Sequence, residues 1–236
     1  MSRPPDRVGL ALGPIAVPRR EERIGPLSDV NAQCLRWLIK VSSHGRHAES
    51  GLLGEISGRL CALTTSERSH AARFPFLLVD MRFDDLEWWH RMGSQVGLAP
   101  PRPLWLSPLP RKSTVGLARS TLVLAWHTAR VDREAAVLLI GLSPPIASHL
   151  TRLHLQDLDR VAEKHYRHLR PRWSDQPSIW RHLLEASRTQ EMTSGASFVL
   201  RGLQLAAGEL LPIQAQGLAV RERSETPSVL LARRRR

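Results

Sequence analysis

The chain has 236 residues, of which 42% are hydrophobic, so it can bury one sizeable core or two small ones. Its formal net charge of +12 favours a polyanionic partner, such as nucleic acid or an acidic protein surface. Two cysteines are too few for a disulfide framework, and no apolar run reaches the ~18 residues of a membrane span. These features predict a cytoplasmic protein that does not contact a membrane.

Prolines divide the chain. Five of them lie in residues 1–27 and five more follow Ala99, which indicates a disordered leader and a stiff linker that cannot be helical. The predicted parts are a leader (1–27), helical lobe 1 (28–98), a Pro-rich linker (99–115), helical lobe 2 (116–185), a C-terminal helical segment (186–220) and a basic tail (221–236). The fold class expected is all-α, with two tandem lobes and disordered termini.

The first lobe opens with "SDVNAQCLRWLIKV", where Ser28 or Asp29 is a candidate N-cap. The apolar residues that share one face of this helix are Ala32, Leu35, Leu38 and Ile39. Such a face predicts a helix of the core.

A capping box follows in the same lobe. Thr64 and Glu67 stand three apart, which predicts a helix from residue 65 to about 73, ended by Pro75. Residues 76–83, "FLLVDMRF", then favour an extended segment or a short strand.

The second lobe begins with one long helix or two over residues 120–140, which Gly141 ends. Ser143 is the expected N-cap of the next helix, with Pro144 at its first position. We therefore expect a helix-turn-helix-like corner around Gly141.

The two lobes align at an offset of ninety residues. Aromatic residues are kept at Phe76/Tyr166 and Phe83/Trp173. The identical pairs are Gly51/Gly141, Leu52/Leu142, Ile56/Ile146, Leu60/Leu150, Leu63/Leu153, Ala72/Ala162, Arg82/Arg172 and Asp85/Asp175. These matches predict an internal repeat, the alternative being two unrelated helical segments.

The repeated unit resembles a known family, the D subunit of the bacterial flagellar transcriptional activator (FlhD). The similarity runs through "DREAAVLLIGLSPPIASHLTRLHLQDLDRVAE" and "RPRWSD" in lobe 2, and through "GLLGEISGRLCALTTSERSHAARFPFLLVDMRFDD" in lobe 1. The resemblance implies an all-helical, dimerising subunit that activates transcription by binding DNA together with a second, zinc-containing subunit. Two copies in one chain would form a pseudo-dimer, or the chain would form a homo-oligomer.

Before the glycine, the family carries an aromatic residue and then a basic one implicated in activation and DNA contact. Leu138 and Leu139 stand there in lobe 2, and Ala48 and Glu49 in lobe 1, so the basic residue is absent from both. Asp132 matches an acidic position of the family.

Two groups of residues are candidates for DNA contact. Ser148, His149 and Arg152 fall on the expected second helix of the corner, which is either a recognition helix or an ordinary core hairpin. The run "RVAEKHYRHLRPRW" interleaves aromatics with five cations suited to phosphate contact, or else forms a solvated face. These cations are Arg160, Lys164, Arg167, Arg170 and Arg172.

Catalysis is not expected, because the chain contains no nucleotide-binding, nucleophile-elbow or zinc-protease motif. His165 and His168 stand three apart, but histidines in an Arg-rich helix are usually solvated, and no third metal ligand follows by spacing. Trp88 and Trp89 suggest a ligand cage or, more commonly, the closure of a core. We predict no cofactor and no metal.

The sequence thus predicts a transcription regulator that binds DNA with a partner subunit. The alternative is a helical adaptor that binds another regulatory protein without touching DNA, which the neutral first lobe favours.

Overall fold

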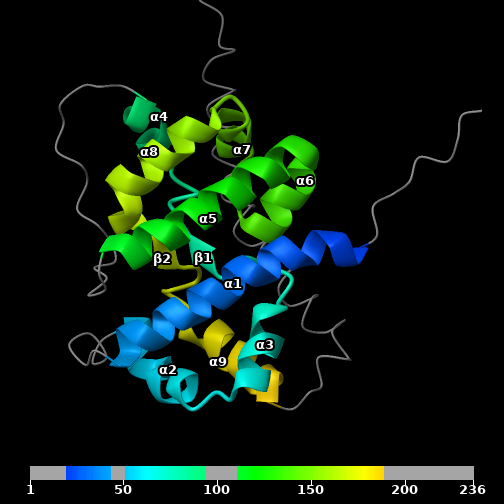
Figure 1. Ribbon diagram of the computed structural model, residues 1–236, viewed down its shortest axis with the longest axis vertical. Coiled ribbons are helices and arrows are strands. Elements are labelled where there is room, and N and C mark those ends of the chain that lie inside the picture. The colour runs from blue at the N-terminus through cyan, green and yellow to red at the C-terminus, as the bar shows by residue number, and fades with distance from the viewer. Residues whose placement is uncertain (1–19, 44–50, 94–110, 189–236) are drawn as a thin grey trace, which may run out of the picture.

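The computed structural model describes residues 20–43, 51–93 and 111–188. These residues form nine α-helices, two further helical turns and one two-stranded ladder around one hydrophobic core (Figure 1). The predicted all-α fold is therefore confirmed. Within the described ranges, no helix combines the length and the apolar character that crossing a membrane requires.

The first half of the chain contains four helices and a strand. They are α1 (Arg20–Ser43), α2 (Gly51–Cys61), α3 (Thr65–Ala72), β1 (Val79–Asp80) and α4 (Leu86–Gly93). The capping box of α3 is confirmed: the Glu67 backbone N–H donates to the Thr64 hydroxyl, and the Thr64 backbone N–H donates to the Glu67 carboxylate.

The second half repeats this order with extra turns. Its elements are α5 (Arg111–Val131), α6 (Arg133–Ala135), the π-helical turn η1 (Ala136–Ile140), α7 (Pro144–Leu150), α8 (Leu155–His165), the 3-10 turn η2 (Tyr166–His168), β2 (Arg170–Pro171) and α9 (Pro177–Arg188). Gly141 ends η1 with a φ of 84°, and α7 begins after Ser143 with Pro144 at its first position, as predicted.

The two strands pair antiparallel, and the ladder places Asp80 opposite Arg170. These two residues are ninety positions apart, the same offset that separates α2's Gly51 from Gly141, so equivalent positions of the two halves meet there. After the strands the offset between equivalent positions grows to ninety-one. The residue with a left-handed backbone is Arg82 (φ 52°) in the first half and Trp173 (φ 55°) in the second. The sequence alignment of Arg82 with Arg172 is therefore one residue out of register with the backbone.

The two halves exchange their last helices. Helix α9, from the second half, packs against α2 and α3 of the first half, while α4 packs against α7 of the second (Figure 1). Helices α1 and α5 pack against each other between these groups. A similar hydrogen bond fixes both exchanged helices: the indole N–H of Trp89 donates to the Arg82 carbonyl at 2.9 Å, and that of Trp180 donates to the Arg172 carbonyl at 2.7 Å, one residue before the position that corresponds to Arg82.

A buried asparagine organises the segment after α3. The Asn31 side-chain amide on α1 donates to the carbonyls of Ala72, Phe74 and Phe76, and its oxygen accepts the backbone N–H of Leu78. Alternate backbone groups of residues 74–78 are thus satisfied by a side chain, while the Leu77 N–H donates to the Leu139 carbonyl and the Leu78 carbonyl accepts the Arg172 N–H. This is why the expected strand over residues 76–83 shortens to Val79–Asp80.

Two predicted boundaries are wrong. Helix α1 begins at Arg20 rather than near Ser28 and passes through Pro26, because Leu27 and Val30 are buried in the core and tertiary packing extends the helix. Helix α5 already begins at Arg111, inside the segment expected to be a linker. The remaining parts of the leader, the linker and the C-terminal segments lie outside the described residues, so their predicted character stays a prediction.

Candidate nucleic-acid interface

Helix α7, the predicted recognition helix, does not present its three polar candidates together. The Ser148 hydroxyl donates to the Pro144 carbonyl at 3.1 Å, within the helix itself. The His149 ring lies 5.6 Å from that of His90 and 6.2 Å from that of Trp89, both on α4. Arg152 lies beyond the end of α7, so its expected place on this helix is wrong. With seven residues and α4 packed against it, α7 behaves as part of the core hairpin.

Arg172 is buried, which contradicts its predicted contact with phosphate. Only 5% of the residue is exposed, and its guanidinium donates to the Leu139 carbonyl at 3.2 Å. The guanidinium also lies under Gly141 and 4.5 Å from the centre of the Trp173 ring. Arg172 therefore supports the Gly141 turn from inside.

Arg170 is likewise used inside the fold. Its guanidinium pairs with the Asp80 carboxylate at 2.5 Å and with that of Asp84 at 3.3 Å. These two acids compensate its charge, because carboxylates within such distances neutralise a guanidinium. The phosphate contact predicted for Arg170 is replaced by this internal pairing, which joins the two halves of the chain.

Three of the five predicted phosphate-contacting cations are exposed on one side of α8 and η2. Arg160 and Lys164 stand four apart on α8, so they lie on one face of the helix, away from the buried Leu158 and Ala162, and Arg167 is exposed in η2 directly after it. Arg160 makes a partly exposed pair with Asp157 at 3.3 Å, and such a pair contributes little to stability. These three side chains are available to a ligand.

The first turn of α5 adds a cation that the sequence did not indicate. The guanidinium carbons of Arg111 and Arg167 lie 5.8 Å and 5.7 Å from the centre of the Tyr166 ring. Arg111 also donates to the Glu163 carbonyl at 3.3 Å, and Arg167 donates to the Tyr166 hydroxyl at 3.2 Å. Arg111 comes 44 residues before the start of α8 at Leu155, and its only signal is that it follows the last proline of the Pro-rich segment.

We call Arg111, Arg160, Lys164, Arg167 and the Tyr166 ring that Arg111 and Arg167 approach the α5–α8 basic face. Two acids of α8 are held by another cation, since Arg119 pairs with Asp159 at 2.7 Å and with Glu163 at 3.6 Å, and a third, Asp157, pairs with Arg160. The basic face is thus left with an excess of positive charge and one aromatic ring, a combination that suits a phosphate backbone and its bases.

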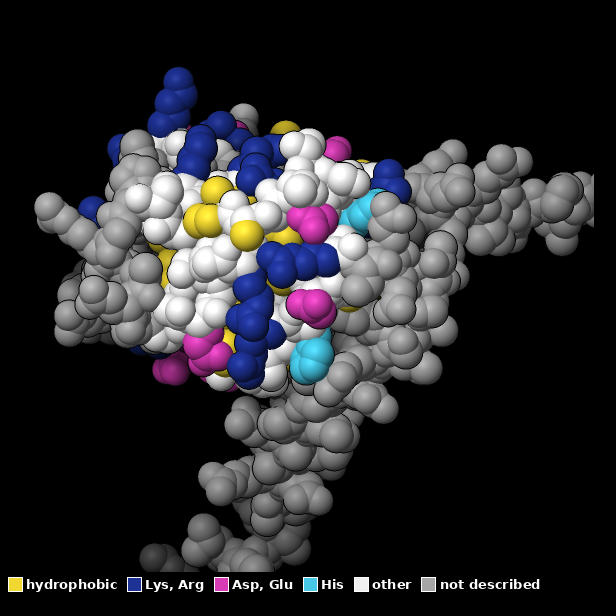
Figure 2. Space-filling view, turned by 90° about the horizontal axis from the view of Figure 1, so that it is seen from below, with side chains coloured by type: hydrophobic (Ala, Val, Ile, Leu, Met, Phe, Trp, Pro, Cys, Tyr) yellow, Lys and Arg dark blue, Asp and Glu magenta, His cyan; other side chains and the backbone are white. Residues whose placement is uncertain are grey.

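At the opposite end of the molecule, cations and acids lie side by side. Figure 2 looks onto the end formed by α2, α3 and α9, where Lys and Arg side chains lie in a row with Asp and Glu beside them. Arg181 pairs with Glu55 at 3.8 Å and Arg188 with Glu67 at 4.0 Å, each joining α9 to the first half. Two cations at this end are therefore paired with acids across the contact between α9 and the first half.

The two histidines weighed as metal ligands are packed rather than solvated. The ring of Trp88 lies 5.4 Å from that of His165 and 5.0 Å from that of His168, and only 5% of His168 is exposed. Burial and the nearby Arg82 lower the pKa of His168 to about 4. Over the described ranges, no three His, Cys, Asp or Glu residues gather as a metal site would require. Trp88 and Trp89 are themselves buried, so they close the core.

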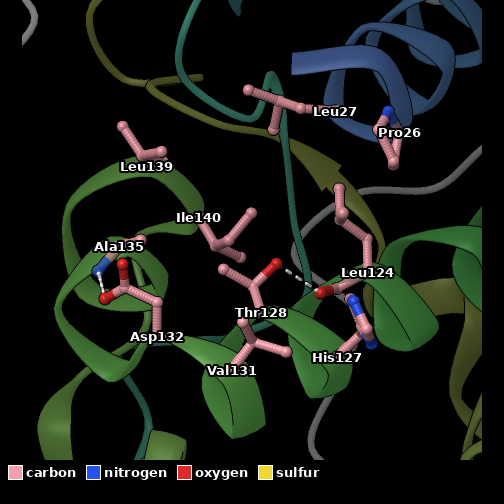
Figure 3. A pocket seen from close by; sticks show the side chains of 10 residues that line it. All are labelled: Pro26, Leu27, Leu124, His127, Thr128, Val131, Asp132, Ala135, Leu139 and Ile140. Atoms are coloured by element: carbon pink, nitrogen blue, oxygen red, sulfur yellow. Dashed lines mark hydrogen bonds between the residues drawn. The ribbon is translucent and has the colours of Figure 1, made fainter. Parts of the chain in front are cut away.

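An apolar groove is the second candidate site. It has a volume of about 140 Å³ and lies between the start of α1, the end of α5 and the α6–η1 turn. Figure 3 shows Leu27 and Leu124 on one side and Leu139 and Ile140 on the other. Val131 at its edge is 64% exposed, which is unusual for a large aliphatic side chain.

Comparison with models of known protein families finds no match, and comparisons with curated proteins and with solved structures find none either. The resemblance to the FlhD family accordingly stays a prediction from the residues, and the geometry of the chain's own side chains carries the functional argument.

Proposed function

We propose that this protein is a non-catalytic transcription regulator that holds nucleic acid by its phosphate backbone, through the α5–α8 basic face. The observation that carries the proposal is that the guanidinium carbons of Arg111 and Arg167 lie 5.8 Å and 5.7 Å from the centre of the Tyr166 ring. An aromatic ring offers a stacking surface to an unpaired base, and the two guanidinium groups offer fork-shaped donors to phosphate oxygens.

Base reading is not part of the proposal. Helix α7 has seven residues and α4 packs against it, so it has no free polar face to place in a major groove. Sequence selection would then come from a partner subunit, as the resemblance to the flagellar activator also implies.

The test measures DNA affinity against salt concentration for Arg111→Ala and Arg167→Ala. Each lost phosphate contact should make the log-log slope shallower by about 0.9 and weaken binding to every duplex tested. Arg181→Ala is the matched control, because it removes one arginine that is paired with Glu55 at the opposite end of the molecule. An unchanged slope in both test variants would refute the proposal.

Tyr166→Leu separates stacking from charge, since it removes the ring and keeps both arginines. It should weaken binding to single-stranded DNA by about 1–3 kcal/mol while leaving the salt slope intact.

The alternative function is that of an adaptor for another regulatory protein, and the apolar groove of Figure 3 favours it. Capture of partners from the native host with and without nuclease discriminates the two. A partner lost on nuclease treatment supports the regulator, whereas a partner that persists after nuclease and is lost in Val131→Asp supports the adaptor.

A further inference from the structure

A second basic feature lies between α1 and α5, apart from the α5–α8 basic face. It is a groove of about 220 Å³, well above the ~10–15 Å³ that a cavity needs to hold one water molecule. Three cations line it, Arg36 and Lys40 from α1 and Lys112 from α5, together with the polar side chains of Gln33 and Ser113. The groove is therefore large enough for an oxyanion and is lined by donors.

Two of the three cations of this groove are not compensated by an acid of its described lining. Among the described residues that line the groove there is no Asp or Glu, and over the described ranges neither Arg36 nor Lys112 forms an ion pair. Elsewhere the arrangement is different, since Arg119 has Asp159 and Glu163 beside it. Arg36 and Lys112 line one hollow and repel each other, and a bound anion would relieve that repulsion.

The walls of the groove are fixed before any ligand arrives. Helices α1 and α5 pack along each other, and the buried indole N–H of Trp37 donates to the Thr114 hydroxyl at 3.4 Å. Lys112 and Ser113 belong to the first turn of α5, where backbone N–H groups have no partner within the helix. The positive end of the helix dipole thus adds to the side-chain charges.

Gly116 keeps the groove open. It lies on α5, one turn after Lys112, and a Cβ built on it would meet no atom within 4 Å. A larger residue at this position would project into the groove without disturbing the packing of the helices.

We propose that the α1–α5 groove binds phosphate groups, in the form of a chain of two or more linked phosphates. Arg36 supplies a fork-shaped donor pair, while Lys40 and Lys112 supply point charges on the two sides of the ligand. The proposal does not depend on nucleic acid, because a free polyphosphate and a nucleic-acid backbone offer the same oxyanions.

The test is calorimetric titration of the full chain with inorganic tripolyphosphate at constant ionic strength. Gly116→Glu places a carboxylate in the groove and should weaken binding at least about tenfold, because two like charges a few ångströms apart repel. Gly116→Gln has the same size without the charge and should lose clearly less affinity than Gly116→Glu, so the difference between the two variants gives the effect of the charge. The Arg36→Ala/Lys112→Ala double variant should bind tripolyphosphate about tenfold or more weakly, and it replaces Gly116→Glu as the test variant if that variant fails to fold. Equal affinity in the parent chain, Gly116→Glu and the double variant would overturn the proposal, as would the absence of binding to the parent chain.

A competition experiment then identifies the source of the phosphate. If tripolyphosphate displaces a labelled DNA duplex and Gly116→Glu weakens the duplex too, the groove takes the nucleic-acid backbone. If Gly116→Glu loses tripolyphosphate and keeps the duplex, the groove takes a small phosphorylated ligand. Both results support the proposal that the groove binds phosphate groups. Tripolyphosphate binding without any DNA binding would overturn the proposed regulator function alone.

Discussion

Asp80 and Arg170 occupy equivalent positions of the two halves of the chain, and they form an ion pair across the strand ladder. An antiparallel ladder that joins equivalent positions has a local two-fold axis, so a residue at this point faces its own counterpart. Two first halves would bring Asp against Asp, and two second halves would bring Arg against Arg. The opposite charges therefore select pairing of the first half with the second.

Neutralising one member of this pair should destabilise the fold. Asp80→Asn keeps the oxygen that accepts the Phe83 backbone N–H but leaves the Arg170 charge, which is 24% exposed, without its main partner. We expect a loss of about 2 kcal/mol in the free energy of unfolding, between the values for surface and buried pairs. Urea denaturation measures it. The charge-swapped variant Asp80→Arg/Arg170→Asp should recover part of the loss, and no recovery would show that charge complementarity is unimportant here.

The two turn glycines should respond differently to alanine. Both have a positive φ, 68° at Gly51 and 84° at Gly141, which costs about 1–2 kcal/mol for a residue with a Cβ. A Cβ at Gly51 meets nothing within 4 Å, whereas one at Gly141 would lie 2.5 Å from the guanidinium carbon of Arg172. Gly141→Ala should therefore cost about 2 kcal/mol more than Gly51→Ala, because a buried charged group must move.

Thermal or urea unfolding of the two single variants gives this difference directly. Equal losses would mean that Arg172 relaxes at no cost, contrary to its burial.

Acid should destabilise the protein through the histidines around Trp88. The folded state lowers the pKa of His168 to about 4 because of burial and the nearby Arg82 and His165, with Asp85 acting in the opposite direction. The unfolded chain has an ordinary histidine pKa near ~6.5 and so binds more protons at acid pH. The free energy of unfolding should have its full value above about pH 6.5 and fall by about 2–3 kcal/mol as the pH drops towards 4.

Urea unfolding at several pH values checks this, with His168→Gln as the variant that cannot take up the proton. His165 and His149 also have a lowered pKa, mainly through burial, so the variant should flatten the pH dependence only in part. An identical pH dependence in the variant would contradict the assignment to His168.

Weakening α9 should loosen the first half of the chain. Leu184 is fully buried on this helix, and Leu184→Ala should cost about 2–5 kcal/mol. Because α9 packs against α2 and α3, hydrogen exchange should speed up first over residues 51–72. Faster exchange confined to α7 and α8 would show that the helices are not exchanged in solution.

The parts of the fold that depend on residues close together in the sequence could be predicted from it. The capping box of Thr64 and Glu67, the left-handed Gly141 and the start of α7 after Ser143 each depend on residues within a few positions of one another. Asn31 could not be found in this way, because its hydrogen-bond partners are more than forty residues away.

The candidate interface was predicted only in part, for the same reason. Arg160, Lys164 and Arg167 were predicted from the basic run that contains them, and all three are exposed. The burial of Arg172 depends on a space beneath Gly141, thirty-one residues earlier, and the contribution of Arg111 depends on how α5 meets α8. Neither the burial of Arg172 nor the contribution of Arg111 can be predicted from the charge of a run of residues.

The exchange of α4 and α9 has a consequence for synthesis of the chain on the ribosome. When α4 has just been made, α2 and α3 still lack the helix that covers them, since α9 ends only at Arg188. At about 5–20 residues per second, the intervening stretch of about 95 residues takes roughly 5–20 s to translate. During that interval the nascent first half exposes leucines such as Leu52 and Leu60, which are buried in the finished protein. This unfinished surface is a substrate for chaperones that bind emerging chains, so the yield of native protein should depend on them more than its modest size suggests.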